Sequence, residues 1–252
     1  MESQAIFDRD LINKNYKRWK DNFHASSFLF KFSEEEIINR LSLIKRDFES
    51  VAIIGSRNCG ILFDYLDKKN SNIDVIDINA DEILPFETDS YDLIISIMEL
   101  HKINNIKQLL LQIRYSLKEG GAFLGVMAGE SNLIELKKAI MMAETEISGG
   151  INPRIHPVMG MKSMSGLLQE IGFSMPVIDI EKLTILYKNS NHLMKDLRYM
   201  GESNVLKNRS KKFTKSALFK KTDDLYKKYY INKENRINAS FELIFLTGWA
   251  DN

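Results

Sequence analysis

The sequence predicts an α/β fold in which a mostly parallel sheet is covered by helices on both faces. Three observations support this class. Short apolar strands alternate with helical patterns through the first half of the chain. The first two strand segments are short and mainly apolar, and the segment at 51–54 is expected to be buried. Two further strand segments close to the end suit an antiparallel hairpin at one edge. The strands are expected at 51–54, 73–78, 91–97, 122–127, 177–187 and 240–249.

Helices are expected between and around these strands. One covers residues 8–20, and Ser33 followed by Glu36 matches a capping box that would begin another helix. The helix expected at 105–117 would end at Gly120-Gly121 through a left-handed cap. Further helices are expected at about 61–66, 131–147, 163–171, 190–200 and 211–230.

The length favours one main domain. We expect an N-terminal helical segment at 1–48 and a domain at 49–252, with helical insertions at about 131–172 and 190–235. The net charge is +1, which implies no general attraction to nucleic acid. A single cysteine, Cys59, suits a reducing compartment. No apolar run reaches the ~20 residues of a membrane span, and no targeting signal is evident, so a cytoplasmic protein is expected.

A glycine turn after the first strand is the main candidate for ligand binding. The turn runs from Gly55 to Gly60, between a strand and a helix, and would present backbone N–H groups to a ligand. Asp77 ends the second strand, where a carboxylate can accept hydrogen bonds from a ribose. The competing interpretation is a plain strand–helix turn with a capping acid.

Two later segments resemble the class I S-adenosylmethionine (SAM) methyltransferases. They are LPFETDSYDLIIS, beginning at Leu84, and LKEGGAFLG, beginning at Leu117. The resemblance implies a Rossmann-like sheet and a SAM site. The residues assigned to the cofactor are Gly55, Ser56, Gly60, Asp77, Ile78, Asp81, Glu82 and Ser96.

Other blocks resemble the complex I assembly factor 5 family. They are IFDRDL at 6–11, AETEISGGINPRIHP at 143–157, MGESN at 200–204 and GW at 248–249. The resemblance covers nearly the whole chain. It implies a methyltransferase-fold protein whose relatives hydroxylate an arginine on the iron–sulfur subunit of NADH:ubiquinone oxidoreductase, so that subunit is the expected partner.

Two departures from the methyltransferase pattern bear on the cofactor. Ile53 stands where these enzymes usually carry an acid that helps to hold the methionine part of SAM. Asp77 and Asp81 lie so close in sequence that no room remains for the helix and third strand that normally separate them. We therefore expect a sheet without that strand, with 73–78 as its new edge, and SAM binding that is weakened or lost.

Four residues are candidates for a catalytic role. Glu99 and His101 follow the strand at 91–97, and Glu144 and Arg154 are placed beside the site by the family resemblance. Glu144, with Glu146, could clamp a substrate arginine; a solvated helix face is the competing interpretation. No histidine is followed by the Xaa-acid pattern of an iron site, so no metal ligand is assigned.

Residues 207–236 carry eleven Lys or Arg against three acids. This segment would suit an acidic membrane surface, an acidic protein or RNA. The apolar spacing of Leu218, Leu225 and Tyr226 instead favours a packed helix with a solvated basic face. Peripheral contact with a membrane therefore remains an open alternative. No membrane span is expected.

Three functions remain open at this point. The first is an enzyme of the complex I assembly group, either a protein-arginine hydroxylase or a SAM-dependent methyltransferase. The second is a non-catalytic assembly factor that no longer binds SAM. The third is a methyltransferase of a small molecule or a carrier-bound acyl group. MGESN disfavours the third, and Ile53 and the missing segment favour the second over active methyl transfer. The sequence does not decide between the first two.

Overall fold

The computed structural model describes residues 5–55, 57 and 60–251. The chain divides into two compact units. The sheet unit comprises Ser27–Gly129, Val158–Glu181 and Leu243–Asn252, and the helical unit comprises Met1–Ser26, Glu130–Pro157 and Lys182–Glu242. The sequence-based boundary at residue 48 stays a prediction.

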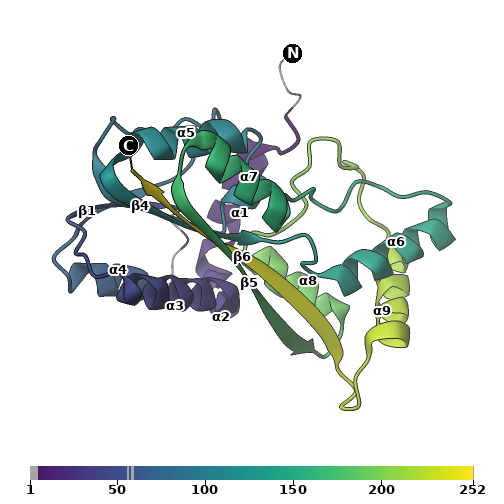
Figure 1. Ribbon diagram of the computed structural model, residues 1–252. Coiled ribbons are helices and arrows are strands. Elements are labelled where there is room, and N and C mark those ends of the chain that lie inside the picture. The colour runs from purple at the N-terminus through teal and green to yellow at the C-terminus, as the bar shows by residue number, and fades with distance from the viewer. Residues whose placement is uncertain (1–4, 56, 58–59, 252) are drawn as a thin grey trace. The chain divides into compact units, whose positions relative to one another are not determined.

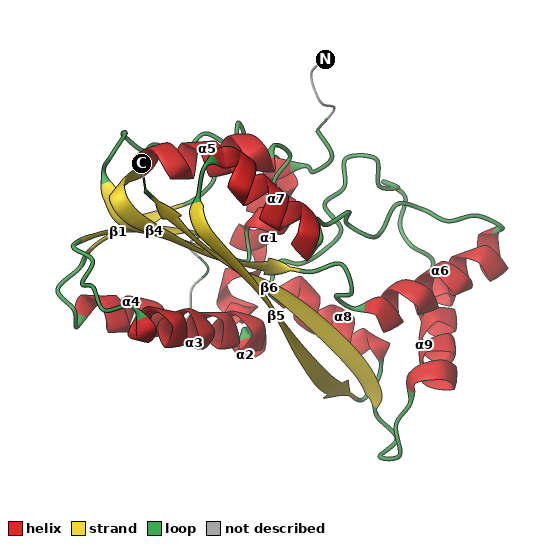
Figure 2. Ribbon diagram, in the orientation of Figure 1, coloured by secondary structure: helices red, strands yellow, loops and turns green. Residues whose placement is uncertain are grey.

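The sheet has the order β2-β1-β3-β4-β6-β5. β1 pairs in parallel with β2 and β3, β3 pairs in parallel with β4, and β6 is antiparallel to β4. Figure 2 shows β6 beside β5 at the other edge of the sheet. Within the described residues, the missing third strand, the new edge at β2 and the antiparallel strand near the other edge are all confirmed. The strands are β1 Ser50–Ile54, β2 Asn72–Ile76, β3 Tyr91–Ile97, β4 Leu117–Ala128, β5 Ser174–Tyr187 and β6 Ile237–Ala250.

Helices cover both faces of the sheet unit (Figure 1). α3 (Phe28–Leu43) and α4 (Ile61–Asp67) lie on one face, and α5 (Ile106–Ser116) and α7 (Met161–Ile171) lie on the other. Apolar side chains from the strands, α5 and α7 form a continuous buried cluster. Burial of this apolar area holds α5 and α7 against the sheet.

Two local expectations were wrong. Ser33 does not cap a helix: it lies inside α3, and its Oγ donates to the Leu29 carbonyl at 2.7 Å. The preceding apolar residues, among them the buried Leu29 and Phe30, extend the helix toward its N-terminus. α5 ends at Ser116 rather than at the glycine pair, because Leu117 already begins β4 and Gly120 takes its positive φ of 68° within that strand.

The helical unit contains six helices within the described residues. They are α1 Arg9–Trp19, the 3-10 helix η1 Lys20–Asn22, α2 Phe23–Ser26, α6 Ile134–Ser148, α8 Ser190–Tyr199 and α9 Ser216–Tyr230. α6 packs against α9. Leu218, Leu225 and Tyr226 of α9 are buried, as expected for a packed helix with a basic outer face. Among the described residues, no helix is long and apolar enough to cross a membrane.

Candidate functional site

The carboxyl ends of β1 and β3 form the edge where a ligand was expected. Gly55 follows β1 with a φ of 104°, and its N–H donates to the Ile76 carbonyl of β2 at 2.9 Å. Gly60, with a φ of 85°, directly precedes α4. Both glycines therefore adopt a left-handed backbone that other residues rarely tolerate. Ser56 lies outside the described residues.

The open side of Gly55 is filled by the chain's own side chains. A Cβ placed on Gly55 would lie 3.0 Å from Cγ of Glu99. Arg57 Nη2 donates to Glu99 Oε1 at 2.9 Å and lies 3.4 Å from the Met98 carbonyl oxygen. The guanidinium carbon of Arg57 stands 4.6 Å from the centre of the Phe30 ring. We call the group formed by Phe30, the Met98 carbonyl and Glu99 the guanidinium cradle.

The guanidinium cradle is nearly closed to solvent. The side chains of Arg57 and Glu99 are 10% and 4% exposed, and Phe30 is fully buried. An ion pair this deeply buried interacts strongly, because little water screens it. Arg57 and Phe30 had no assigned role in the sequence analysis, although a basic residue inside a glycine turn was visible there.

The first turn of α4 is also satisfied internally. The Leu62 N–H donates to Oε2 of Glu34 at 3.0 Å, and Glu34 is completely buried. A helix N-terminus attracts anions, because its first N–H groups have no partner within the helix. Here the Glu34 carboxylate, from α3, already occupies the position that such an anion would take. Glu34 was not identified from the sequence, because its partner lies 28 residues away.

These observations test whether SAM fits the described residues. Ile53 is fully buried and presents no acceptor to a ligand ammonium group. The Glu99 side chain covers Gly55, and Glu34 accepts the hydrogen bond of the Leu62 N–H. Ser96 would suit a ligand, since its buried Oγ has no hydrogen-bond partner among the described residues. As folded, the described residues of this edge do not fit SAM, and we derive no step through it.

The remaining residues assigned to the cofactor have different surroundings. Asp77 and Asp81 are exposed, whereas Ile78 is buried in the core. The Glu82 carboxylate accepts hydrogen bonds from both backbone and side chain of Asn104 and from the Asn105 N–H, at 2.9–3.0 Å. Glu82 therefore anchors its own loop to the start of α5.

Glu99 and His101 lie together at the carboxyl end of β3. Glu99 directly precedes the 3-10 helix η2 (Leu100–Lys102), which contains His101. His101 is 5% exposed and Lys102 is fully buried. The structure thus places both predicted catalytic residues of this unit at the edge occupied by Gly55.

Glu144 and Arg154 are brought together in the helical unit. Arg154 Nε donates to Glu144 Oε1 at 2.7 Å, and both the backbone N–H and Nδ2 of Asn152 donate to the same carboxylate. Burial alone would raise the pKa of Glu144, but the hydrogen bonds from Arg154 and Asn152 outweigh it and lower that pKa. Glu144 therefore already holds an arginine of its own chain.

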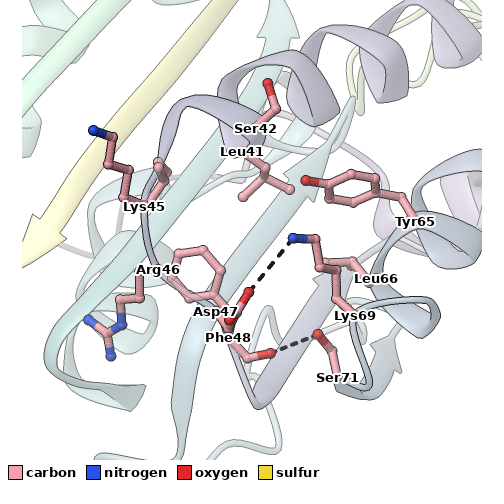
Figure 3. A pocket seen from close by; sticks show the side chains of 11 residues that line it. Leu41, Ser42, Lys45, Arg46, Asp47, Phe48, Tyr65, Leu66, Lys69 and Ser71 are labelled. Atoms are coloured by element: carbon pink, nitrogen blue, oxygen red, sulfur yellow. Dashed lines mark hydrogen bonds and ion pairs between the residues drawn. The ribbon is translucent and has the colours of Figure 1, made fainter.

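A pocket lies at the opposite end of the strands, beside the amino ends of β1 and β2 (Figure 3). Its volume of about 460 Å³ is within the range of small-molecule sites. Lys69 and Asp47 form an exposed ion pair at 3.7 Å within it. None of the predicted site residues lines this pocket. Ligands of open parallel sheets bind at the carboxyl ends of the strands, so the pocket is not the candidate site.

Comparison with known proteins identifies the family. A model described as "Methyltransferase domain" matches residues 62–125. Arginine-hydroxylase NDUFAF5 from Mus musculus is 32% identical over 97% of this chain and 77% of its own length. The chain belongs to the NDUFAF5 family. A malonyl-[acyl-carrier protein] O-methyltransferase from Xylella fastidiosa is 30% identical over 66% of this chain and 54% of its own length.

The solved structures place this NDUFAF5-family chain in the methyltransferase fold. A protein from Bacillus halodurans described as a "putative methyltransferase" superimposes with a TM-score of 0.55 at 13% identity, covering 86% of this chain and 98% of that one. Identity this low supports the fold alone. The predicted Rossmann-like methyltransferase fold is thereby confirmed together with the family.

Three of the blocks that carry the family resemblance meet in the helical unit. Asn204 Nδ2 donates to the Pro153 carbonyl at 2.8 Å, and the Val205 N–H donates to His156 Nε2 at 3.2 Å. The Phe7 ring packs edge-on against His156, with ring centres 5.4 Å apart. Segments around residues 7, 153 and 204 therefore form one contact network outside the matched methyltransferase domain.

Proposed function

We propose that this chain is a protein-arginine hydroxylase of complex I assembly, acting on an arginine of the iron–sulfur subunit of NADH:ubiquinone oxidoreductase. One observation carries the proposal: the relationship to arginine-hydroxylase NDUFAF5 extends over 97% of the chain. It includes the network around His156 and Asn204, which lies outside the matched methyltransferase domain. A shared fold alone would not support an activity.

Hydroxylation replaces a C–H bond of the arginine by C–OH. One oxygen atom of dioxygen enters the C–OH group, and the other leaves as water after taking up two electrons from a reductant and two protons. Among the described residues, no group of three or more His, Cys, Asp or Glu is arranged to hold a metal ion. We therefore assign no residue to oxygen activation. The chain's own contribution is to bind and orient the protein substrate.

A non-catalytic assembly factor is the second candidate. Glu99 over Gly55 and the buried Ile53 favour it, because both oppose SAM binding. Transfer of a methyl group to a carrier-bound acyl group is less well supported, since the malonyl-carrier relative aligns with only 66% of the chain. We also propose that the basic face of α9 makes peripheral contact with a membrane. A cytoplasmic location is part of the same proposal.

Mass spectrometry of the iron–sulfur subunit tests the proposal. The subunit is isolated from cells that lack this chain and from cells in which the gene is restored. We expect one arginine to gain the mass of an oxygen atom only when the chain is present. Restoration with Glu35→Ala, an exposed position of α3, serves as the matched control and should restore the modification. A gain of a methylene mass would indicate methyl transfer, and no change with normal assembly would favour the non-catalytic factor.

Calorimetry tests cofactor binding independently of the arginine modification. S-adenosylhomocysteine and SAM are titrated into the full chain. We expect no measurable heat, because Arg57 and Glu99 close the glycine turn. Tight binding would show that this edge opens for SAM and would restore methyl transfer as the leading function.

A further inference from the structure

We propose that the guanidinium cradle is the recognition site for the substrate arginine, and that Arg57 occupies it in the absence of substrate. The inference rests on the proposed function, because the ligand it names is the side chain of a protein arginine. It goes further by assigning Phe30, the Met98 carbonyl and Glu99 to that ligand.

The geometry of the cradle matches a guanidinium group. The Glu99 carboxylate accepts from Nη2 at 2.9 Å, and the Met98 carbonyl lies 3.4 Å from the same nitrogen. The Phe30 ring faces the guanidinium carbon at 4.6 Å. A planar cation that donates at its edge and stacks on an aromatic face satisfies all three contacts. A lysine ammonium would meet the charge but not the planar stacking.

The electrostatics favour exchange of one arginine for another. Glu99 is 4% exposed, so removal of its cationic partner would leave a carboxylate buried without that charge. A substrate guanidinium that replaces Arg57 restores the same charge and the same hydrogen bond. The cradle can therefore release Arg57 to an arginine-bearing peptide, whereas a neutral side chain would not restore the positive charge that Arg57 supplies to Glu99.

The position of the cradle also suits a substrate. It lies at the carboxyl ends of β1 and β3, beside Gly55, where ligands of open α/β sheets bind. The other carboxylate–arginine pair, Glu144 with Arg154, differs in its surroundings. Glu144 also accepts two hydrogen bonds from Asn152 and so ties residues 152–154 to α6. That pair is suited to holding the loop.

The test uses the full chain with Arg57→Ala, which empties the cradle. N-methylguanidinium and methylammonium are titrated by calorimetry into this variant and into the double variant Arg57→Ala/Glu99→Gln. We expect methylguanidinium to bind Arg57→Ala at least about tenfold more tightly than methylammonium, and the double variant to lose this preference. A variant that unfolds as cooperatively as the wild type, yet binds neither ion or binds both equally, would overturn the inference.

A second measurement keeps the test decisive if Arg57→Ala does not fold. The wild-type chain is labelled with ¹⁵N-arginine, and the Arg57 signal is assigned from its loss in Arg57→Lys. Titration with methylguanidinium should shift that signal, and a signal that stays fixed contradicts exchange.

The two proposals fail separately. Guanidinium binding in a chain that modifies no arginine would uphold the cradle and reject the proposed function. Arginine modification that persists unchanged in Glu99→Gln would uphold the function and reject the cradle.

Discussion

Glu34 and Leu62 are joined across two helices by a buried hydrogen bond. Oε2 of Glu34, on α3, accepts from the Leu62 N–H in the first turn of α4 at 3.0 Å. The helix N-terminus that opens toward a ligand in this class of fold is thereby capped from within the protein. The bond also links the two helices that cover one face of the sheet unit.

Glu34→Ala should destabilise the sheet unit. The substitution leaves the Leu62 N–H without its buried acceptor, which costs about 1–3 kcal/mol. The measurement is the free energy of unfolding from urea titration monitored by circular dichroism. Glu35→Ala removes the same charge from an exposed position of the same helix and should change stability by less than about 0.5 kcal/mol. Equal effects from the two variants would show that the Leu62 contact contributes nothing.

Glu82→Gln separates a structural role from a cofactor role. The carboxylate receives its hydrogen bonds from Asn104 and Asn105, and an amide in its place turns one acceptor into a donor facing N–H groups. We expect a loss of about 1–3 kcal/mol in unfolding free energy. The exposed Asp81→Asn is the control and should be close to neutral. If Glu82→Gln kept full stability, the anchoring role would be wrong.

The order of the elements was predictable because it depends on local apolar runs. The strands near residues 53 and 94 were located within a few residues, since buried parallel strands are apolar along their whole length. The lost edge strand followed from spacing alone, because Asp77 and Asp81 leave no chain for it. Such features depend on neighbouring residues in the sequence.

The side chains that fill the candidate site could not be predicted from local sequence patterns. Arg57 and Glu99 are separated by 42 positions, and no local pattern links them. At Ser33 a local pattern was present but was not used. The sequence matches a capping box there, but burial of Leu29 and Phe30 in the preceding turn extends the helix past Ser33. Local chemistry predicts what a segment can do, and tertiary packing decides which option is used.

The stability contributed by Glu144 should depend on pH. The pKa of this carboxyl is lowered in the folded chain from its ordinary value of 4.5: burial opposes the shift, and Arg154 and Asn152 outweigh burial. A lowered folded pKa means that the charged form stabilises the protein above the unfolded pKa. That contribution is lost as the pH falls from 4.5 through the lowered value.

Unfolding of the wild type and of Glu144→Gln, followed in urea between pH 7 and pH 3, checks this dependence. The wild type should be more stable at neutral pH, and the difference should shrink on the acid side of 4.5. Glu146→Gln is the matched control, because the Glu146 carboxylate is half-exposed in its ion pair with Lys221. A difference that stayed constant over the whole range would contradict the assigned role of the Glu144 charge.

Substitution of two glycines of the sheet unit by alanine should change the stability of the protein in opposite directions. Gly248, in β6, faces Phe173: an added Cβ would lie 2.9 Å from Cδ1 and 3.0 Å from Cβ of that side chain. A methyl group there must displace a buried aromatic side chain, which costs about 1–3 kcal/mol. This contact gives a packing reason for the glycine of the GW pair.

Gly166 provides the counterpart. It lies on the exposed side of α7, and an added Cβ would meet no atom within 4 Å. Alanine restricts the unfolded chain and favours the helix, so Gly166→Ala should stabilise the protein by about 0.5–1 kcal/mol. Thermal unfolding of the two variants beside the wild type measures both effects, with Gly248→Ala melting below it and Gly166→Ala above. If Gly248→Ala melted with the wild type, Phe173 would be free to move, and the close packing of β6 against the end of α7 would not be a constraint on the sequence.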